Sequence, residues 1–366
     1  MYAYQHKNWP NWNWDEKEVL ALLIEVISKQ NKLLGKLSIL GFDIKERTAL
    51  ETGVLDVIKN SGIEGEELRE SHVRSSIAKN LGLNVEEDDS VKLEATEGAI
   101  NMFIDSTRNY KLPMTPDRLF DWHSGLFPTG RSAGKKIVVA NWRLSKDPMQ
   151  IVSGAMGREK VHYEAPSSEH IPGMMNQLID YINSGKDHPM IMAAISHLWF
   201  EVIHPFDDGN GRIGRAIADT LLCRADELEY RYYSFSNAVL QNKKEYYSFL
   251  NKASKGDLNI TEWIEWFLKI VNNSIDNSEK VLEKVDFKRK FWENYAGVIF
   301  NDRQLKVLGK LLDGFEGYMT SSKWTRMTKC TRMTATRDIN DLIEKDILLK
   351  NESGGRSTSY KLNDRF

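Results

Sequence analysis

The chain has 366 residues, 28% of them charged, and a formal net charge of −2 at pH 7. This length allows two or three domains, and the near-neutral balance gives no global charge that would direct the protein to nucleic acid or to a membrane. The two cysteines, Cys223 and Cys330, lie far apart in sequence, which favours a reducing compartment over a disulfide framework.

No segment has the pattern of a membrane insertion signal. The N-terminus, "MYAYQHKNWPNWNWDEKE", lacks the apolar core of a signal peptide. The longest apolar stretch, residues 190–203, contains Ser196, His197 and Glu201 and is shorter than the roughly 20 apolar residues that span a bilayer. We therefore expect a cytoplasmic protein with no membrane partner.

Hydrophobic periodicity predicts a mainly α fold. Leu and Ile recur at spacings of three and four over residues 15–42, which indicates an amphipathic helix that begins near Asp15 and ends at Gly41. Further helices are predicted at residues 43–60, 168–184, 188–202, 211–225, 242–255 and 261–285.

Residues 135–165 have a different composition, rich in β-branched and aromatic side chains. The run "KKIVVANWR" at 135–143 is strand-like. The run "MQIVSGAMGREKVHYEA" at 149–165 has two strand-like halves separated by Gly154 and Gly157, and we predict a β-hairpin there.

The last part of the chain, after about residue 290, reads as three helices followed by a hairpin with a Gly-Gly turn, the pattern of a winged helix-turn-helix. Residues 320–337 contain five basic and no acidic residues, and residues 301–366 contain thirteen basic and nine acidic ones, a net charge of +4. That charge is modest for DNA affinity. DNA binding and a protein-docking or dimer module both remain open.

The segment "HPFDDGNGRIGR" at 204–215 concentrates chemistry in twelve residues. Pro205 ends the preceding helix and favours an extended His204, whose ring, with an ordinary pKa of about 6.5, suits a general base. Gly209 and Gly211 allow converging backbone amides, and a helix that begins near Asn210 directs its N-terminus at an anion.

Charged side chains in the same segment complete a polyphosphate site. Arg212 and Arg215 share a helical face and can hold phosphate oxygens, while Asp208 offers a hard oxygen ligand for Mg²⁺. A solvated loop with a satisfied histidine is the alternative. The coincidence of a base, an anion nest, a carboxylate and two arginines favours the phosphate site.

This segment resembles the signature of the Fic-domain family, His-Pro-Phe-x-Asp/Glu-Gly-Asn-Gly-Arg-x-x-Arg, at every fixed position. Residues from about 95 to 285 resemble the Fic core, including "WHSGLFP", "QIVSGAMGREKVHYEAP", "KKEYYSFLNKASKGD" and "TEWIEWFL". The opening "WPNWNWD" resembles the N-terminal segment of one bacterial subgroup, whose members often end in a winged helix.

The resemblance implies three regions. Residues 1–94 would form an N-terminal helical region that carries an inhibitory segment. Residues 95–288 would form the Fic core, a helical bundle with a small β-hairpin flap, and residues 289–366 would form the winged helix-turn-helix domain.

The resemblance also implies protein adenylylation, in which AMP moves from ATP to a Ser, Thr or Tyr hydroxyl of a target protein or of the enzyme itself. His204 would take the hydroxyl proton, and Asp208 would hold Mg²⁺. The backbone of Gly209, Asn210 and Gly211, together with Arg212, would stabilise charge on the phosphoryl oxygens, and Arg215 would bind the γ-phosphate.

By the same resemblance, Ile151, Val152, Ser153 and Gly154 form a flap that covers the nucleotide and docks the target as an added strand. Tyr246 and Tyr247 match a tyrosine pair near the base and ribose. Alternatively, these two tyrosines are helix residues that pack in the core.

The stretch "SGIEGE" at 61–66 resembles the family's inhibitory motif, Ser/Thr-x-x-x-Glu-Gly/Asn. Glu64 would pair with Arg215 and block the γ-phosphate. Asn60 stands at the Ser/Thr position of the motif. The alternative that Glu64 is an ordinary glutamate at a solvated helix end therefore stays open. In some relatives the same glutamate supports AMP removal.

Two other functional hypotheses stay open at the sequence level. One is a DNA-binding regulator whose Fic site senses nucleotide. The other is a Fic transferase with a different donor, such as UTP, CDP-choline or a phosphorylated target. A homodimer is compatible with the sequence, which identifies neither the target nor the oligomeric state.

Three further aromatic or histidine features have structural interpretations. His197 and His123 read as core histidines, because no Cys/His cluster or His-Glu-x-x-His spacing accompanies them. The tryptophans of "WPNWNWD" are expected to pack the N-terminal arm onto the helical body, with a ligand-binding cage as the alternative.

Overall fold

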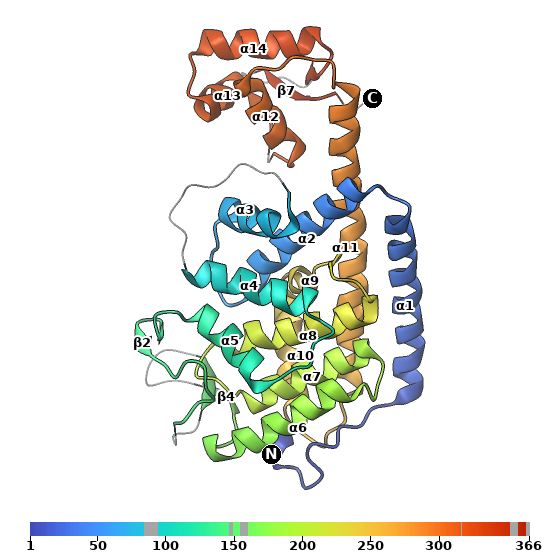
Figure 1. Cartoon of the computed structure of the whole chain (residues 1–366), viewed down its shortest axis with the longest axis vertical. Coiled ribbons are helices and arrows are strands. Elements are labelled where there is room, and N and C mark those ends of the chain that lie inside the picture. Colours follow the sequence, from blue (N-terminus) through green and yellow to red (C-terminus); the bar gives the residue numbers. More distant parts are fainter. Residues whose placement is uncertain (84–93, 146–148, 154–159, 316, 352–357, 364–366) are drawn as a thin grey trace. The chain divides into compact units, whose positions relative to one another are not determined.

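The computed structural model describes residues 1–83, 94–145, 149–153, 160–315, 317–351 and 358–363. The chain divides into two compact units, Met1–Val281 and Leu282–Phe366 (Figure 1). No helix in the described part of the chain is long and apolar enough to cross a membrane.

The first unit is mainly helical, as predicted. Its helices are η1 (Ala3–Gln5), α1 (Glu16–Ser38), α2 (Phe42–Ile63), α3 (Glu70–Leu81), α4 (Glu94–Arg108), α5 (Pro116–Leu126), η2 (Ser168–His170), α6 (Ile171–Ser184), α7 (Pro189–Ile203), α8 (Asn210–Asp226), α9 (Phe235–Gln241), α10 (Lys243–Ala253) and the part of α11 (Thr261–Asn294) up to Val281. Its strands are β1 (Arg131–Ser132), β2 (Lys135–Lys136), β3 (Gln150–Ser153) and β4 (Lys160–Glu164).

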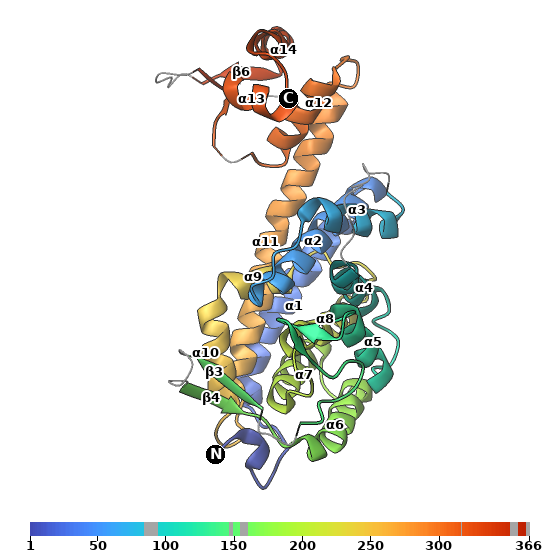
Figure 2. The ribbon, with the colours of Figure 1, turned by 90° about the vertical axis from the view of Figure 1, so that its left-hand side faces the viewer.

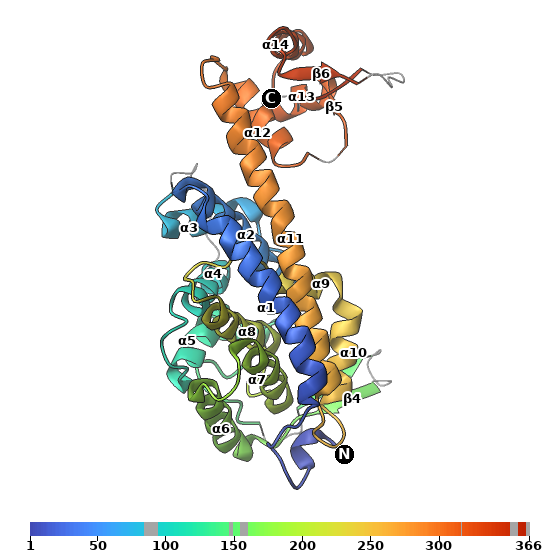
Figure 3. The same cartoon turned by 90° about the vertical axis from the view of Figure 1, so that its right-hand side faces the viewer.

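Helices α7 and α8 lie at the centre of this unit, with α4, α5, α6 and α10 around them (Figure 2). Every residue of 190–203 except Glu201 is buried, because α7 is apolar on all sides and must be covered all round. Helix α1 runs beside α11 (Figure 3), and the pair is joined by an ion pair of 2.6 Å between Lys29 and Asp276. The core therefore surrounds the helix pair whose connecting loop is the 204–209 segment.

The predicted hairpin is confirmed. Strands β3 and β4 pair antiparallel, with Gln150 opposite Glu164 and an irregularity between Ile151 and Val152. The predicted tight turn at Gly154 and Gly157 lies outside the described residues.

The strand predicted at 135–143 is wrong beyond Lys136. Ala140 has a positive φ of 54°, which a strand does not allow. The backbone of this run bonds to side chains and loops instead: Val138 N–H donates to Asp207 (2.9 Å), and Arg143 N–H donates to the Pro205 carbonyl (2.9 Å). The β-branched run serves to support the 204–209 loop.

Two helix boundaries also differ from the sequence-based expectation. Helix α1 ends at Ser38, and Gly41 is the N-cap of α2 rather than the end of α1. Helix α9 was not predicted, and its N-cap is Ser234, whose side chain accepts from Asn237 N–H.

The N-terminal arm packs onto the helical body, as expected. Trp9 contacts Trp12 and, at a ring-centroid distance of 5.8 Å, Trp199 of α7. Tyr2 packs edge-on against Tyr163 of β4, which ties the arm to the hairpin.

The second unit contains the C-terminal part of α11, then α12 (Asp302–Leu312), β5 (Met319–Thr320), α13 (Ser321–Thr328), α14 (Arg332–Glu344), β6 (Leu348–Lys350) and β7 (Ser359–Leu362). Its three strands form an antiparallel sheet in the order β5-β7-β6. The buried Trp324 and Ile339 belong to its core. The predicted Gly-Gly turn at 354–355 lies outside the described residues.

Candidate active site

The loop between α7 and α8 begins with a left-handed residue. His204 has φ 50° and ψ 62°, and its N–H donates to the Phe200 carbonyl (2.9 Å). The expectation of an extended His204 is therefore wrong. Helix α7 ends with a left-handed C-cap residue. This helix ending outweighs the preference for extended backbone that Pro205 imposes on the residue before it.

Side chains buried in the loop fix its path into α8. Asn210 accepts from Phe206 N–H (3.0 Å) and donates to the Phe206 carbonyl (2.9 Å), and the buried Phe206 ring stacks on His123 at 4.2 Å. Gly209 has φ 83°, and a Cβ there would lie 2.8 Å from the Phe127 ring. The first amides of α8, which have no partner inside the helix, are therefore held in one place.

The His204 side chain is 13% exposed, and its Nδ1 has no hydrogen-bond partner among the described residues. Nδ1 lies 3.9 Å from the Glu201 carboxylate. Burial, and then the Arg143 guanidinium, lower the pKa of His204 to about 4. The ring is therefore neutral at physiological pH, and a neutral imidazole keeps one nitrogen lone pair that can accept a proton, as a general base requires.

The predicted pair between Glu64 and Arg215 is present. Arg215 is fully buried, and its Nη2 donates to Glu64 (2.7 Å), the C-cap residue of α2. Burial alone would lower the pKa of Arg215, but the Glu64 carboxylate and its neighbours raise it above its ordinary value. Nη1 of Arg215 is buried without a partner among the described residues.

Asn60 supports the same arginine from α2. Its side-chain oxygen accepts from Arg215 Nε (2.6 Å), its carbonyl accepts from Nη2 (3.1 Å), and its amide donates to the Arg212 carbonyl (3.4 Å). Asn60 stands where the inhibitory motif has Ser or Thr. The departure from the motif therefore retains a polar side chain that contacts the arginine.

Sequence reasoning missed the partner of Arg212. Its Nη1 donates to both oxygens of Glu66 at 2.7 Å, and its guanidinium lies 5.0 Å from the Phe127 ring centroid. Glu66 is the second glutamate of "SGIEGE", and that repeated acidic residue was the available signal. One segment thus supplies a carboxylate to each arginine of the signature.

Asp208 and Gly211 complete the arrangement. Asp208 is about half exposed, accepts from Gly209 N–H (2.6 Å) and accepts from the Ser132 hydroxyl of β1, a contact that the sequence did not indicate. A Cβ on Gly211 would lie 2.3 Å from a Glu64 carboxylate oxygen. The glycine therefore lets the Glu64 carboxylate approach the first turn of α8.

Residues 113–222, which include this loop and both arginines, match the Fic/DOC family. We call this matching region, residues 113–222, the Fic domain. Residues 2–83 match a second family, a domain of unknown function designated DUF4172, which includes the segment with Glu64 and Glu66.

Curated relatives of the Fic domain are named as adenylyltransferases. The chain is 34% identical over 117 residues to protein adenylyltransferase Fic of Nematostella vectensis, a match covering 30% of this chain and 25% of the relative. It is 29% identical over 114 residues to a probable protein adenylyltransferase of Aquifex aeolicus, covering 31% and 33%. The chain thus spans about a quarter to a third of these relatives.

Solved Fic structures share the fold. A Fic family protein from Desulfovibrio desulfuricans G20 gives a TM-score of 0.51 at 17% identity, covering 93% of this chain and 96% of that protein. A Fic domain containing signaling protein from Bacteroides thetaiotaomicron also gives 0.51 at 17% identity, covering 73% and 98%.

The two tyrosines near the Fic domain differ in their surroundings. Tyr246 is buried, and its hydroxyl hydrogen-bonds to Nε2 of His197 (2.8 Å), which has the core contacts predicted for it. Tyr247 is 43% exposed, with its ring centroid 5.0 Å from that of Tyr246. Only Tyr247 therefore offers an open ring surface.

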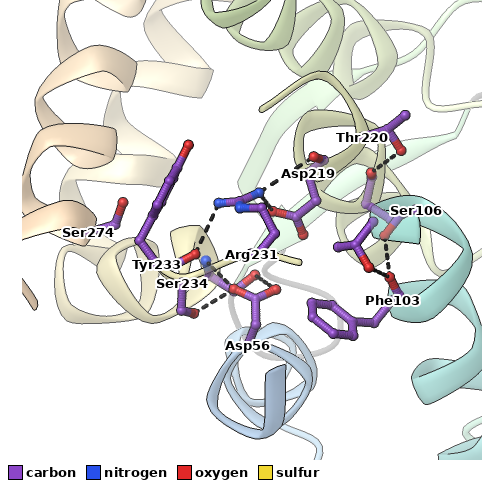
Figure 4. Close-up of polar contacts among 12 residues, drawn as sticks. Asp56, Phe103, Ser106, Asp219, Thr220, Arg231, Tyr233, Ser234 and Ser274 are labelled. Carbon is purple, nitrogen blue, oxygen red and sulfur yellow. Dashed lines mark hydrogen bonds and ion pairs between the residues drawn. The ribbon is translucent and has the colours of Figure 1, made fainter. Parts of the chain in front are cut away.

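A buried ionic network holds the segment with Glu64 against the Fic domain. Arg231 donates to Asp219 of α8 (2.7 Å) and to the Tyr233 carbonyl (3.1 Å), while Asp56 of α2 accepts from the Ser234 hydroxyl (Figure 4). Burial, and then Asp56, raise the pKa of Asp219 well above its ordinary value. The Asp56 carboxylate of α2 thus lies close enough to Asp219 of α8 to disfavour the charged form of Asp219.

Proposed function

We propose that this Fic domain transfers AMP from ATP to a Ser, Thr or Tyr hydroxyl of a target protein and of itself. The observation that carries the proposal is the neutral His204 placed directly before an anion-binding helix N-terminus that also carries Arg212 and Arg215. The names of the curated relatives, which match over this same region, support it.

In the proposed reaction, the acceptor hydroxyl oxygen attacks the α-phosphorus of ATP. His204 takes the hydroxyl proton, the bond to the β-phosphate oxygen breaks, and pyrophosphate leaves. The backbone amides from Gly209 to Gly211 and the Arg212 guanidinium stabilise the charge that develops on the phosphoryl oxygens. Arg215 binds the γ-phosphate.

The donor set fits Mg²⁺ that is held largely by the nucleotide. No cluster of three or more His, Cys, Asp or Glu suited to a metal occurs among the described residues. Asp208 offers a half-exposed carboxylate beside the helix N-terminus, and Mg²⁺ is commonly held by one or two carboxylates plus substrate phosphates. When bound there, Mg²⁺ would neutralise charge on the phosphates.

The target would lie along β3, which pairs with β4 on one side. Among the described residues, β3 pairs with no other strand, so its second edge can accept an extended segment by strand addition. Tyr247, with its open ring surface, would contact the base or ribose of the nucleotide.

The chain would be held inactive by its own segment 61–66. Glu64 forms an ion pair with the Arg215 guanidinium, and Glu66 forms an ion pair with the Arg212 guanidinium. The phosphates of ATP would have to displace both carboxylates to reach the same donors. Autoinhibition therefore follows from direct competition for two arginines.

Transfer to a target can be tested with labelled nucleotides and a cell lysate. We expect the Glu64→Gly form, with Mg²⁺ and ATP labelled at the α-phosphate, to label lysate proteins, and mass spectra of their peptides to show AMP on hydroxyl side chains. Glu67→Gly is the matched control, because Glu67 is exposed and has no partner among the described residues. Labelling that persists in Glu64→Gly/His204→Ala, or that requires UTP, would contradict the proposal.

A further inference from the structure

The outer face of α14, in the second unit, is polar and basic. Five exposed residues recur at positions i, i+1, i+4, i+5 and i+8 of the helix, which places them on one face: Arg332, Met333, Thr336, Arg337 and Asn340. The opposite face, with Ala335, Ile339 and Leu342, is buried in the core of the unit.

Two of the three acidic side chains of α14 are engaged in internal contacts, and the third, Glu344, is exposed. Asp338 is buried and accepts from Arg303 Nε (2.7 Å) and from the Asn301 amide (3.0 Å). Asp341 pairs with Lys345 (2.7 Å) and accepts from the Gln304 amide (2.7 Å). These carboxylates therefore do not neutralise the outer face.

Four basic side chains of α13, α14 and the turn between them are exposed, while Lys323 is half-buried, with its Nζ 4.8 Å from the Phe315 ring centroid. Arg326, Lys329, Arg332 and Arg337 are exposed, and none of them has an ion pair with the residues that the structure describes. No acidic residue occurs between positions 320 and 337. Uncompensated positive charge thus gathers on the outer side of α13 and the N-terminal half of α14.

We propose that this basic face binds duplex DNA, with the N-terminal half of α14 in the major groove and these four cations on phosphates. Helix α13, a turn with Lys329 at φ 51°, α14 and the β6–β7 pair follow one another in the order of a winged helix-turn-helix. The C-terminal end of α14 carries Asp341 and Glu344 on the same side of the helix, so we place the phosphates along its N-terminal half.

The face also has groups that suit base edges. Asn340 carries an amide oxygen and an amide nitrogen of the kind that contact adenine in the major groove. Phosphate contacts would provide affinity, and Asn340 would provide sequence preference. The inference concerns a different unit from the Fic domain and does not depend on AMP transfer.

Binding can be measured by fluorescence anisotropy with the full-length protein and a labelled random-sequence duplex of about 30 base pairs at several salt concentrations. The variant Arg332→Ala/Arg337→Ala tests the face. Lys306→Ala/Lys310→Ala is the control, because it removes the same charge from exposed positions on α12 in the same unit. Circular dichroism checks that both variants are folded.

We expect the wild type to bind at low salt with an affinity that falls steeply as salt rises. Arg332→Ala/Arg337→Ala should weaken binding about ten-fold or more and reduce the logarithmic salt slope by about 2, because each arginine would neutralise one phosphate. The α12 variant should stay within about two-fold. Absence of binding by the wild type, equal weakening in the two variants, or stronger binding of single-stranded RNA than of the duplex would each overturn the inference.

AMP transfer by the same variants separates this inference from the proposed function. In the Glu64→Gly background, Arg332→Ala/Arg337→Ala should leave auto-modification unchanged within about two-fold while DNA binding weakens about ten-fold or more. Failure of AMP transfer in every form would contradict the Fic proposal alone, since the DNA measurement uses no nucleotide donor.

Discussion

Glu66 and Glu64 provide two carboxylates for two arginines, yet their surroundings differ. Both arginines are buried, whereas Glu64 is about a third exposed and Glu66 is about half exposed. Water screens the more exposed Glu66 carboxylate more strongly, so replacing Glu64 on the fully buried Arg215 should have the larger effect. The two contacts should therefore oppose ATP to different extents.

The affinity for ATP, measured by calorimetry in a His204→Ala background that prevents turnover, checks this difference. Adding Glu64→Gly should tighten ATP binding about ten-fold or more, equivalent to about 1.4 kcal/mol. Adding Glu66→Ala should tighten it about two- to five-fold, and adding Glu67→Ala should have no effect. Weaker ATP binding after Glu66→Ala would mean that Glu66 assists nucleotide binding.

The pH dependence of AMP transfer should differ from that expected for a general base with the ordinary pKa of histidine. Burial and Arg143 lower the pKa of His204, while the Glu201 backbone and the Glu64 and Asp208 carboxylates act in the opposite direction, leaving it at about 4. The ring is thus neutral from about pH 5.5 to 7.5. With saturating ATP and Mg²⁺, the Glu64→Gly form should lose less than two-fold in rate across that range. A pKa of about 6.5 would cause a loss of about ten-fold.

Glu201 is the group whose titration could be confused with that of His204. Burial raises the pKa of Glu201 to about 7 despite the opposing Arg215 guanidinium, so its carboxyl gains charge as pH rises through neutrality. Glu64→Gly/Glu201→Gln keeps this side chain neutral. A ten-fold acidic loss that persists in the double variant would show that His204 titrates at its ordinary value.

At the scale of residues, the sequence indicated those contacts that a motif encodes. The pair between Glu64 and Arg215 was predicted because both belong to recognisable patterns. The hydrogen bond from the Ser132 hydroxyl to Asp208 was not predicted, because the two residues lie on separate elements and no spacing rule connects them. The left-handed His204 was mispredicted because helix closure competes with the rule for residues before proline.

At the scale of elements, the crossing of α4 and α5 depends on two glycines. A Cβ on Gly98 of α4 would lie 1.9 Å from the Gly125 carbonyl oxygen of α5, so the helices would have to separate. Gly98→Ala should lower the free energy of unfolding by about 3 kcal/mol, measured by urea denaturation.

Gly173→Ala in α6 is the control for this substitution. A Cβ there would meet no atom within 4 Å, and alanine is the better helix former. We expect no loss, and a gain of up to about 1 kcal/mol. Equal stability of the two variants would show that α4 and α5 do not approach as closely as described.

Periodicity predicted most helices because their buried faces repeat every three to four residues. It failed at residues 137–143, where β-branched side chains resemble a strand but the backbone bonds to the 204–209 loop. The short α9 was missed because seven residues are too few to show a repeat. In both cases tertiary contacts, rather than local pattern, decide the structure.

At the scale of the whole molecule, composition indicated the change in character near residue 290, and the structure divides between Val281 and Leu282 within α11. The continuous helix gives no local signal of a boundary, so the sequence could not place it. Each unit has its own buried core and its own candidate binding face.

The central claim is that His204 and the first turn of α8 catalyse AMP transfer that Glu64 restrains. Intact mass spectrometry of the full-length protein after incubation with ATP and Mg²⁺ tests it most directly. We predict that Glu64→Gly gains the mass of one or more AMP groups, that the wild type gains far less, and that Glu64→Gly/His204→Ala gains none. An adduct that survives His204→Ala, or equal modification of the wild type and Glu64→Gly, would contradict it.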